Sequence, residues 1–393
     1  MKSVNFLTKK SIYKQILNKN FSNKTITVEL PSILESSEFE KFENTFPKTS
    51  TTNTDELVRY YKTLYLWRRF EYEADNLYKQ KFIRGFCHLY IGQEAICLGM
   101  EEGLTKNDPI ISAYRVHCQA LARGFTPRQV MAEMMSKHTG STKGKGGSMH
   151  YYNTKEHFYG GHGIVGAQIP LGTGLAFGIK YKNQDAACFT LYGDGSTNQG
   201  QLLEASNMAG LMKLPICYVI ENNKYAMGTA SHRHNFHHPI MSKFRSFPGV
   251  KVDGQCVFNM REWSRWAKKH VIKYGPMFME IDTYRYQGHS MSDPGISYRS
   301  KDEVTEFRKS RDCIAKIRKI LLDHNLKTEK EIEDMEEEVK NKLDEEIKQA
   351  QNDPFPNESE LFTEVYYNQE NMYIRSSTVE KSYHLNLLEG NSH

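Results

Sequence analysis

The sequence has 393 residues, of which 39% are hydrophobic and 25% are charged, a composition typical of a folded globular protein and not of a disordered chain. Its longest apolar run, residues 214–220, is far shorter than the ~18 residues that a membrane helix requires, so we expect no membrane span. Six of the 52 basic residues are lysines that precede Glu29, and the other 46 stand against 47 acidic residues, which argues against nucleic-acid binding.

The first 28 residues have the composition of a mitochondrial transit peptide. They are rich in lysine, serine and asparagine and contain no acidic residue. They also contain no arginine, which departs from the usual pattern, so a solvated tail of a cytosolic protein stays as the alternative. Residues 29–54 are expected to form an irregular arm.

The remaining chain predicts an α/β fold with a helical extension. The spacing of apolar residues predicts helices over 55–78, 93–104, 127–137, 169–182, 199–212 and 260–273, and strands over 186–192, 215–220 and 277–284. Residues 301–351 are charged and helical, with i,i+4 pairs of opposite charge. We therefore expect a parallel sheet flanked by helices over residues 55–300, followed by a helical C-terminal extension and tail over 301–393.

The strongest functional signal lies at the ends of two predicted strands. Gly193-Asp194-Gly195 ends the first strand, and Asn222-Asn223 follows the second. One strand–helix–strand crossover separates Asp194 from Asn223, so both side chains are expected at neighbouring strand tips. Carboxylate and amide oxygens suit Mg²⁺, and the glycines let the backbone approach phosphate groups. An ordinary Asp-Gly turn with an unrelated asparagine pair is the alternative, and the matching strands and helix argue against it.

A second glycine pattern matches that of a different cofactor site. Residues 161–166 satisfy G-x-G-x-x-G, the pattern of a dinucleotide-binding turn. Because residues 155–159 do not read as a buried strand, the required context is missing, and we expect no dinucleotide site here.

Five further segments carry a resemblance to a protein family. They are Arg84–His88, Ala113–Arg115, Lys143–His150, Gly163–Gln168 and Tyr284–Gly295. Together with the two strand ends, in this order, they resemble the alpha subunits of the thiamine diphosphate-dependent 2-oxoacid dehydrogenases, from about residue 50 to about residue 355. The segments 143–150 and 163–168 favour the branch that acts on pyruvate. A branched-chain 2-oxoacid dehydrogenase alpha subunit and a non-catalytic regulatory relative stay as alternatives.

The resemblance implies roles for individual residues. Mg²⁺ would be bound by Asp194, Asn223 and the carbonyl of Tyr225. The residues that would contact thiamine diphosphate are Tyr114, Arg115, Gly163, Val165, Asp194, Gly195, Ser196, Asn223, Tyr225 and His289. His88 and His289 would be the active-site histidines, since a histidine can donate or accept a proton near neutral pH.

The resemblance also implies regulation and partners. Ser290 and Ser297 match inhibitory phosphorylation positions, where added negative charge would repel the diphosphate. Ala230 stands where the family has a third regulatory serine, and Gln287 replaces a usual histidine. The implied partners are a beta subunit in an α₂β₂ heterotetramer, the lipoyl domains of a dihydrolipoyl transacetylase, and a regulatory kinase and phosphatase. The implied reaction is oxidative decarboxylation of pyruvate with reductive acetylation of lipoyl groups, on the way to acetyl-CoA in the mitochondrial matrix.

Overall fold

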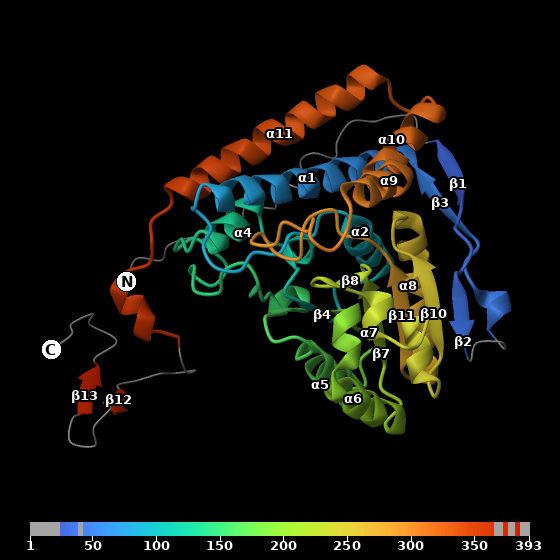
Figure 1. Cartoon of the computed structure of the whole chain (residues 1–393), viewed down its shortest axis with the longest axis horizontal. Coiled ribbons are helices and arrows are strands. Elements are labelled where there is room, and N and C mark those ends of the chain that lie inside the picture. The colour runs from blue at the N-terminus through green and yellow to red at the C-terminus, as the bar shows by residue number, and fades with distance from the viewer. Residues whose placement is uncertain (1–23, 38–41, 365–371, 376–381, 386–393) are drawn as a thin grey trace.

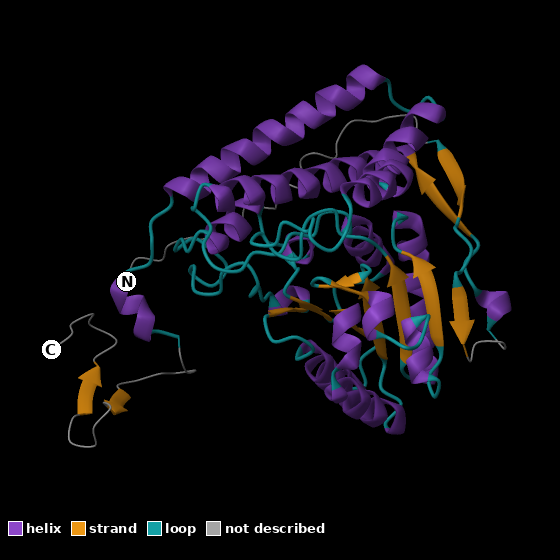
Figure 2. Cartoon of the chain, in the orientation of Figure 1, coloured by secondary structure: helices purple, strands orange, loops and turns teal. Residues whose placement is uncertain are grey.

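A seven-stranded, mostly parallel sheet forms the centre of the computed structural model (Figures 1 and 2), which describes residues 24–37, 42–364, 372–375 and 382–385. The strand order is β2 (Glu35–Ser37), β10 (Gly249–Asp253), β11 (Met277–Asp282), β7 (Ile216–Asn222), β6 (Cys188–Gly193), β4 (Ile110–Ala113) and β5 (Phe158–His162). All neighbouring strands run parallel except β2, which pairs antiparallel with β10 at the edge. The expected α/β fold with a parallel sheet is confirmed.

The two faces of the sheet serve two hydrophobic cores, because side chains alternate along each strand. Cys217 and Val219 of β7 belong to the larger core, together with helices α2 (Glu94–Gly103) and α8 (Val257–Tyr274). Their neighbours Ile216 and Tyr218 point the other way, into the core beneath α5 (Gln168–Tyr181) and α6 (Gly200–Leu211). β7 is buried at all seven of its residues, which explains why its first five residues, 216–220, form a continuous apolar run.

The predicted helices and strands lie within a few residues of the observed ones. α1 (Thr54–Lys79) begins where the Asn53 side chain accepts a hydrogen bond from the backbone of Glu56, and α4 (Pro127–Met134) begins with a capping box at Thr126. Other short helices and strands are α3 (His117–Ala122), α7 (Ser231–His234), β8 (Tyr225–Ala226), β9 (Thr229–Ala230), β12 (Met372–Arg375) and β13 (Ser382–Leu385). None of the helices in the described part of the chain is long and apolar enough to cross a membrane.

Residues 29–54, expected to be irregular, contain strands instead. β1 (Thr25–Glu29) pairs antiparallel with β3 (Thr49–Asn53), and β2 extends the main sheet. The boundary expected at residue 28 therefore falls inside β1. β2 and β3 were missed because serine and threonine dominate them and leave no alternating apolar pattern, and β1 because its alternation, Ile26 and Val28, covers only two apolar residues. Residues 1–23 of the expected transit peptide lie outside the described residues.

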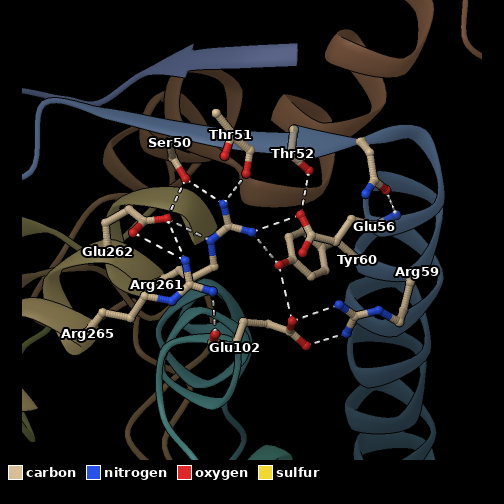
Figure 3. A network of polar contacts seen from close by, with 11 residues as sticks. Ser50, Thr51, Thr52, Glu56, Arg59, Tyr60, Glu102, Arg261, Glu262 and Arg265 are labelled. Atoms are coloured by element: carbon tan, nitrogen blue, oxygen red, sulfur yellow. Dashed lines mark hydrogen bonds and ion pairs between the residues drawn. The ribbon is translucent and has the colours of Figure 1, made fainter. Parts of the chain in front are cut away.

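A buried arginine ties β3 to three helices (Figure 3). Arg261 of α8 is only 2% exposed. Its guanidinium donates to the Glu56 carboxylate and the Tyr60 hydroxyl of α1, both at 2.9 Å. It also donates to Ser50 and to the carbonyl of Thr51 in β3. Tyr60 in turn donates to Glu102 of α2, so one network holds the arm and the helices together.

The C-terminal extension is three helices, α9 (Lys301–Arg311), α10 (Cys313–Asp323) and α11 (Glu329–Asn352), in place of one continuous helical stretch. Figure 1 shows α11 lying along α1. Its buried residues recur every three or four positions and form one apolar stripe: Ile332, Met335, Val339, Leu343 and Ile347. Lys62 of α1 pairs with Glu338 at 2.7 Å across this contact.

Candidate active site

The carboxyl ends of neighbouring parallel strands bring most of the predicted site residues to one edge of the sheet. Asp194 follows β6, Asn223 follows β7, Tyr114 and Arg115 follow β4, and Gly163 follows β5. β6 and β7 pair in register up to Gly193 and Glu221, so the two strand tips are adjacent. Ligands of open parallel sheets bind at this edge.

Asp194 and Asn223 offer oxygen ligands that suit a hard cation. Asp194 is 2% exposed and Asn223 is 8% exposed. Nδ2 of Asn223 donates to Oε1 of Gln93 at 3.1 Å, which leaves Oδ1 buried and, among the described residues, without a hydrogen-bond partner. Within the described chain no group of three or more histidines, cysteines and acids is placed to hold a metal. A cation here would therefore combine one carboxylate with amide, main-chain and phosphate oxygens, as Mg²⁺ does.

The residues after Asp194 form a tight turn. Gly195 has no room for a side chain, because a Cβ atom there would lie 2.7 Å from Cβ of Ala226. Ser196 is buried beside it, in the 3₁₀ helix Asp194–Asn198. Tyr225 lies in the short strand β8, and its hydroxyl donates to Glu303 of α9 at 3.1 Å. Its side chain therefore points to the extension, and only its main chain is available to a ligand beside Asp194.

Two buried guanidinium groups accompany the strand ends. Arg115 donates to the carbonyls of Leu89 and His289. Arg285 donates to the carbonyl of Met227 and to Tyr298, while its Nε and Nη1 are buried and unpartnered among the described residues. Burial and the nearby charge of Arg115 lower the pKa of Arg285 to about 10. No carboxylate of the described chain forms an ion pair with either arginine, so this region suits an anion.

His88, Tyr114 and His289 form a cluster of rings. The His88 ring centre lies 4.3 Å from that of Tyr114 and 5.3 Å from that of His289. Burial lowers the pKa of His88 to about 2, with a contribution from Arg115. Burial, Arg115 and Arg285 lower the pKa of His289 to about 4. Both imidazoles are therefore neutral at pH 7, and each can donate a hydrogen bond through its ring N–H.

Gly163 and Val165 lie in the turn between β5 and α5. Val165 is 43% exposed, and its carbonyl accepts a hydrogen bond from Nε2 of Gln199 at 3.2 Å. The presence of β5 corrects the sequence analysis, which expected no strand before this glycine-rich turn. The strand was missed because it is short and contains Gly160 and Gly161.

An aspartate holds the loop that carries the two predicted phosphorylation sites. Asp293 accepts hydrogen bonds from the backbone of His289 at 2.6 Å and of Gly295 at 2.8 Å, and from the Tyr298 hydroxyl at 2.5 Å. Ser290 is half-buried, with its hydroxyl 2.9 Å from that of Ser292, and Ser297 is exposed.

Several polar residues of this region were missed by the sequence analysis: Gln93, Glu221, His234 and Arg285. Nε2 of His234 lies 3.0 Å from the Asp194 carboxylate, which a histidine-rich segment alone does not reveal. Glu221 is buried and accepts a hydrogen bond from Tyr90, and burial raises its pKa to about 7. The sequence could have indicated Glu221 as a site residue, because it is an acidic residue next to Asn222-Asn223 and directly follows the apolar run of this strand.

Comparison with known proteins shows the family of this chain. The family model described as "Dehydrogenase E1 component" matches residues 62–359. The chain is 51% identical over 319 residues to the mitochondrial pyruvate dehydrogenase E1 component subunit alpha of Pisum sativum, an alignment that covers 81% of this chain and 80% of that protein. It is 49% identical to the Dictyostelium discoideum subunit over 81% of this chain and 85% of that protein, and 45% identical to the Sminthopsis macroura subunit over 81% and 88%. The chain belongs to the dehydrogenase E1 component family.

Proposed function

We propose that this chain is the alpha subunit of a pyruvate dehydrogenase E1 component. It takes part in the oxidative decarboxylation of pyruvate and the reductive acetylation of lipoyl groups. One observation carries the proposal: Asp194, Asn223 and Arg115 lie at the ends of adjacent strands. The side-chain oxygen of Asn223 has no hydrogen-bond partner among the described residues, and Arg115 forms no ion pair with a carboxylate of the described chain. Similarity over four-fifths of the chain to pyruvate dehydrogenase alpha subunits supports the choice of substrate.

The cofactor in this proposal is thiamine diphosphate with Mg²⁺. Asp194, Asn223 and the carbonyl of Tyr225 hold the cation. Tyr114, Arg115, Gly195 and Ser196 would contact the diphosphate, His289 would contact the cofactor, and the main chain of Gly163 and Val165 would meet the aminopyrimidine ring. Thiamine diphosphate, when bound, supplies the electron sink that the loss of carbon dioxide from a 2-oxo acid requires.

The two histidines offer hydrogen-bond donors on the substrate side of the site. Because burial keeps His88 and His289 neutral, each can present a ring N–H to a developing oxyanion. The carbonyl of His289 accepts from Arg115 at 2.8 Å, which fixes the base of its loop beside the diphosphate-binding arginine. The ring of Tyr114 packs against both imidazoles and limits their rotation.

A beta subunit is expected to complete the site, in an α₂β₂ heterotetramer. An exposed apolar face on α5 and α6 supports a protein partner, since Leu171, Phe177 and Leu211 are 51%, 49% and 79% exposed. A shallow cleft of about 400 Å³ lies on the same face. The family resemblance assigns to the beta subunit the glutamate that activates the cofactor.

Location and regulation follow the relatives. Relatives of this chain are mitochondrial proteins, so we place this subunit in the matrix, with a transit peptide at its N-terminus. Lipoyl domains of a dihydrolipoyl transacetylase accept the acetyl group. A kinase and a phosphatase act on Ser290 and Ser297, where added charge would disturb the loop that Asp293 holds.

The first test uses the chain assembled with its copurified partner. Oxidation of the 2-oxo acid is followed with an artificial electron acceptor at saturating thiamine diphosphate and Mg²⁺, with pyruvate or 2-oxoisovalerate. We expect a strong preference for pyruvate. A preference for 2-oxoisovalerate would assign the branched-chain function, and no turnover with either substrate, despite measured cofactor binding, would indicate a regulatory relative.

A further inference from the structure

A second cleft, of about 670 Å³, lies between α1, α9, α10 and the residues that follow β11, outside the set assigned to cofactor and substrate. Its lining is unusual in composition. It contains four tyrosines and five arginines or lysines, against only two carboxylates, Asp312 and Glu336. Clefts of this size accommodate small organic ligands.

Both of these carboxylates are already engaged. Asp312 accepts from Arg68 at 2.9 Å, and Glu336 accepts from the Tyr61 hydroxyl. By contrast, Arg308 and Lys309 of α9 are exposed, and neither forms an ion pair within the described chain. Arg68, Arg69 and Arg318 are paired with Glu94, Glu73 and Glu329. The unpaired positive charge of the cleft therefore comes from Arg308 and Lys309, against the single carboxylate of Glu336, and this balance favours an anionic ligand.

Tyr286 adds an unpartnered donor to this charge. Two guanidinium groups lie near its ring, those of Arg68 at 5.2 Å and Arg308 at 5.8 Å from the ring centre. The residue is 8% exposed, and its hydroxyl is buried with no hydrogen-bond partner among the described residues. Nε of Arg69, which also lines the cleft, is buried and unpartnered in the same way. Buried donors without partners are costly, so they point to an acceptor that a ligand would supply.

We propose that this cleft binds a nucleoside phosphate. Arg308 and Lys309 bind the phosphate groups, since guanidinium and ammonium donors form charge-assisted hydrogen bonds with phosphate oxygens. The base stacks on one of the tyrosines of α1. Tyr65 and Tyr72 are seven positions apart on that helix, so they lie on one face, and both line the cleft.

The site lies next to the loop that carries His289. Tyr286 and Gln287 both line the cleft and directly precede Gly288. The backbone of Tyr286 donates to the carbonyl of Ile91 at 3.1 Å, and the carbonyl of Gln287 accepts from Arg299. An occupant that contacts these two residues holds the start of the loop, so ligand binding should protect residues 288–299 from proteolysis.

The test is calorimetric titration of ATP into the assembled complex of this chain and its partner. Thiamine diphosphate and Mg²⁺ are kept saturating, so that ATP cannot occupy the diphosphate site. We expect one ATP per chain, and an affinity at least ten-fold weaker in the double variant Arg308→Glu with Lys309→Glu. Lys301→Glu, on the same helix but outside the cleft, is the matched control and should bind ATP normally.

Two further arms make the test specific. Tyr286→Phe removes only the unpartnered hydroxyl and should weaken ATP binding by several-fold, with thermal unfolding as the check on folding. Tripolyphosphate should bind more weakly than ATP, and adenosine more weakly still. Absence of saturable ATP binding, unchanged binding in the double variant, or equal binding of tripolyphosphate and ATP would each overturn the proposal. Cofactor binding, measured separately by titration of thiamine diphosphate, tests the proposed function and does not depend on these outcomes.

Discussion

The side-chain amide of Asn223 is oriented by Gln93, whose Oε1 accepts from Nδ2 of Asn223 at 3.1 Å. This bond decides which atom of Asn223 faces away from its partner, and that atom is the buried oxygen Oδ1. Gln93 therefore acts as a positioning residue for the proposed cation site. Such outer-shell partners hold a ligand in the orientation that the metal requires.

Replacement of Gln93 should weaken Mg²⁺ binding. In Gln93→Leu the amide of Asn223 loses its acceptor and can rotate, so we expect the Mg²⁺ concentration needed for thiamine diphosphate binding to rise about 10- to 100-fold. The measurement is a Mg²⁺ titration followed by cofactor fluorescence or calorimetry. Gln255→Leu is a control, because Gln255 is equally buried and bonds to Gly92 and Thr283 instead. Equal Mg²⁺ requirements in the two variants would contradict the positioning role.

The buried histidines should make stability depend on pH. The pKa of His88 is lowered to about 2 and that of His289 to about 4, so the unfolded chain binds protons below pH ~6.5 that the folded chain does not. Stability is therefore complete above this pH and falls as the pH falls toward the folded values. For His88 alone the loss amounts to about 2 kcal/mol by pH 5.

Denaturant unfolding at pH 7 and pH 5 checks this expectation. His88→Asn should reduce the difference between the two free energies of unfolding, because asparagine does not titrate. His324→Asn serves as a control, since His324 ends α10 and lies outside the ring cluster. An unchanged pH dependence in His88→Asn would show that His88 does not contribute.

The network around Arg261 should carry much of the stability of the arm. Arg261→Leu leaves the Glu56 carboxylate and the Tyr60 hydroxyl without their shared donor in a region that is largely buried. We expect a loss of about 3–5 kcal/mol in the free energy of unfolding, as when one member of a buried pair is removed. Arg265→Leu, at the exposed side of the same network, should cost less than about 1 kcal/mol. Similar losses in the two variants would argue against Arg261 as the central residue.

The sequence predicted the elements whose signals are local. β6 and β7 are mostly apolar, and they end in Gly193-Asp194-Gly195 and Asn222-Asn223, so both the strands and the position of Asp194 and Asn223 at their tips were predictable. The strands of the N-terminal arm and β4, β5 and β10 were not predicted. They are short and hold few alternating apolar residues, and pairing with distant segments stabilises them.

The same distinction applies to the candidate site. Ligand types at strand tips follow from the motifs, but the partners of those ligands do not. Gln93 lies 130 positions before Asn223, and His234 lies 40 positions after Asp194, so no spacing rule connects them. The unpaired state of Arg285 is also invisible in the sequence, because it depends on which carboxylates the fold brings near.

The glycine-rich segment 143–150 should depend on a single buried carboxylate. Glu133 of α4 accepts hydrogen bonds from the backbone nitrogens of Thr142 at 2.8 Å, Gly144 at 3.0 Å and Gly146 at 2.6 Å. The segment therefore wraps around a fixed negative charge. Glu133→Gln keeps the size of the side chain but turns an amide N–H₂ toward backbone donors, which cannot accept its hydrogens.

We expect Glu133→Gln to lower the free energy of unfolding by about 2–3 kcal/mol and to speed proteolytic cleavage between residues 140 and 150. Limited proteolysis with mass spectrometry identifies the cleaved bonds, and denaturant unfolding gives the free energy. Glu156→Gln is a control because Glu156 is only half-buried and its carbonyl, not its carboxylate, accepts from Arg123. Since this segment leads into Tyr151 and β5, its loss should also weaken binding of the cofactor at Gly163. Faster cleavage with normal cofactor affinity would show that the fold of segment 143–150 does not affect cofactor binding.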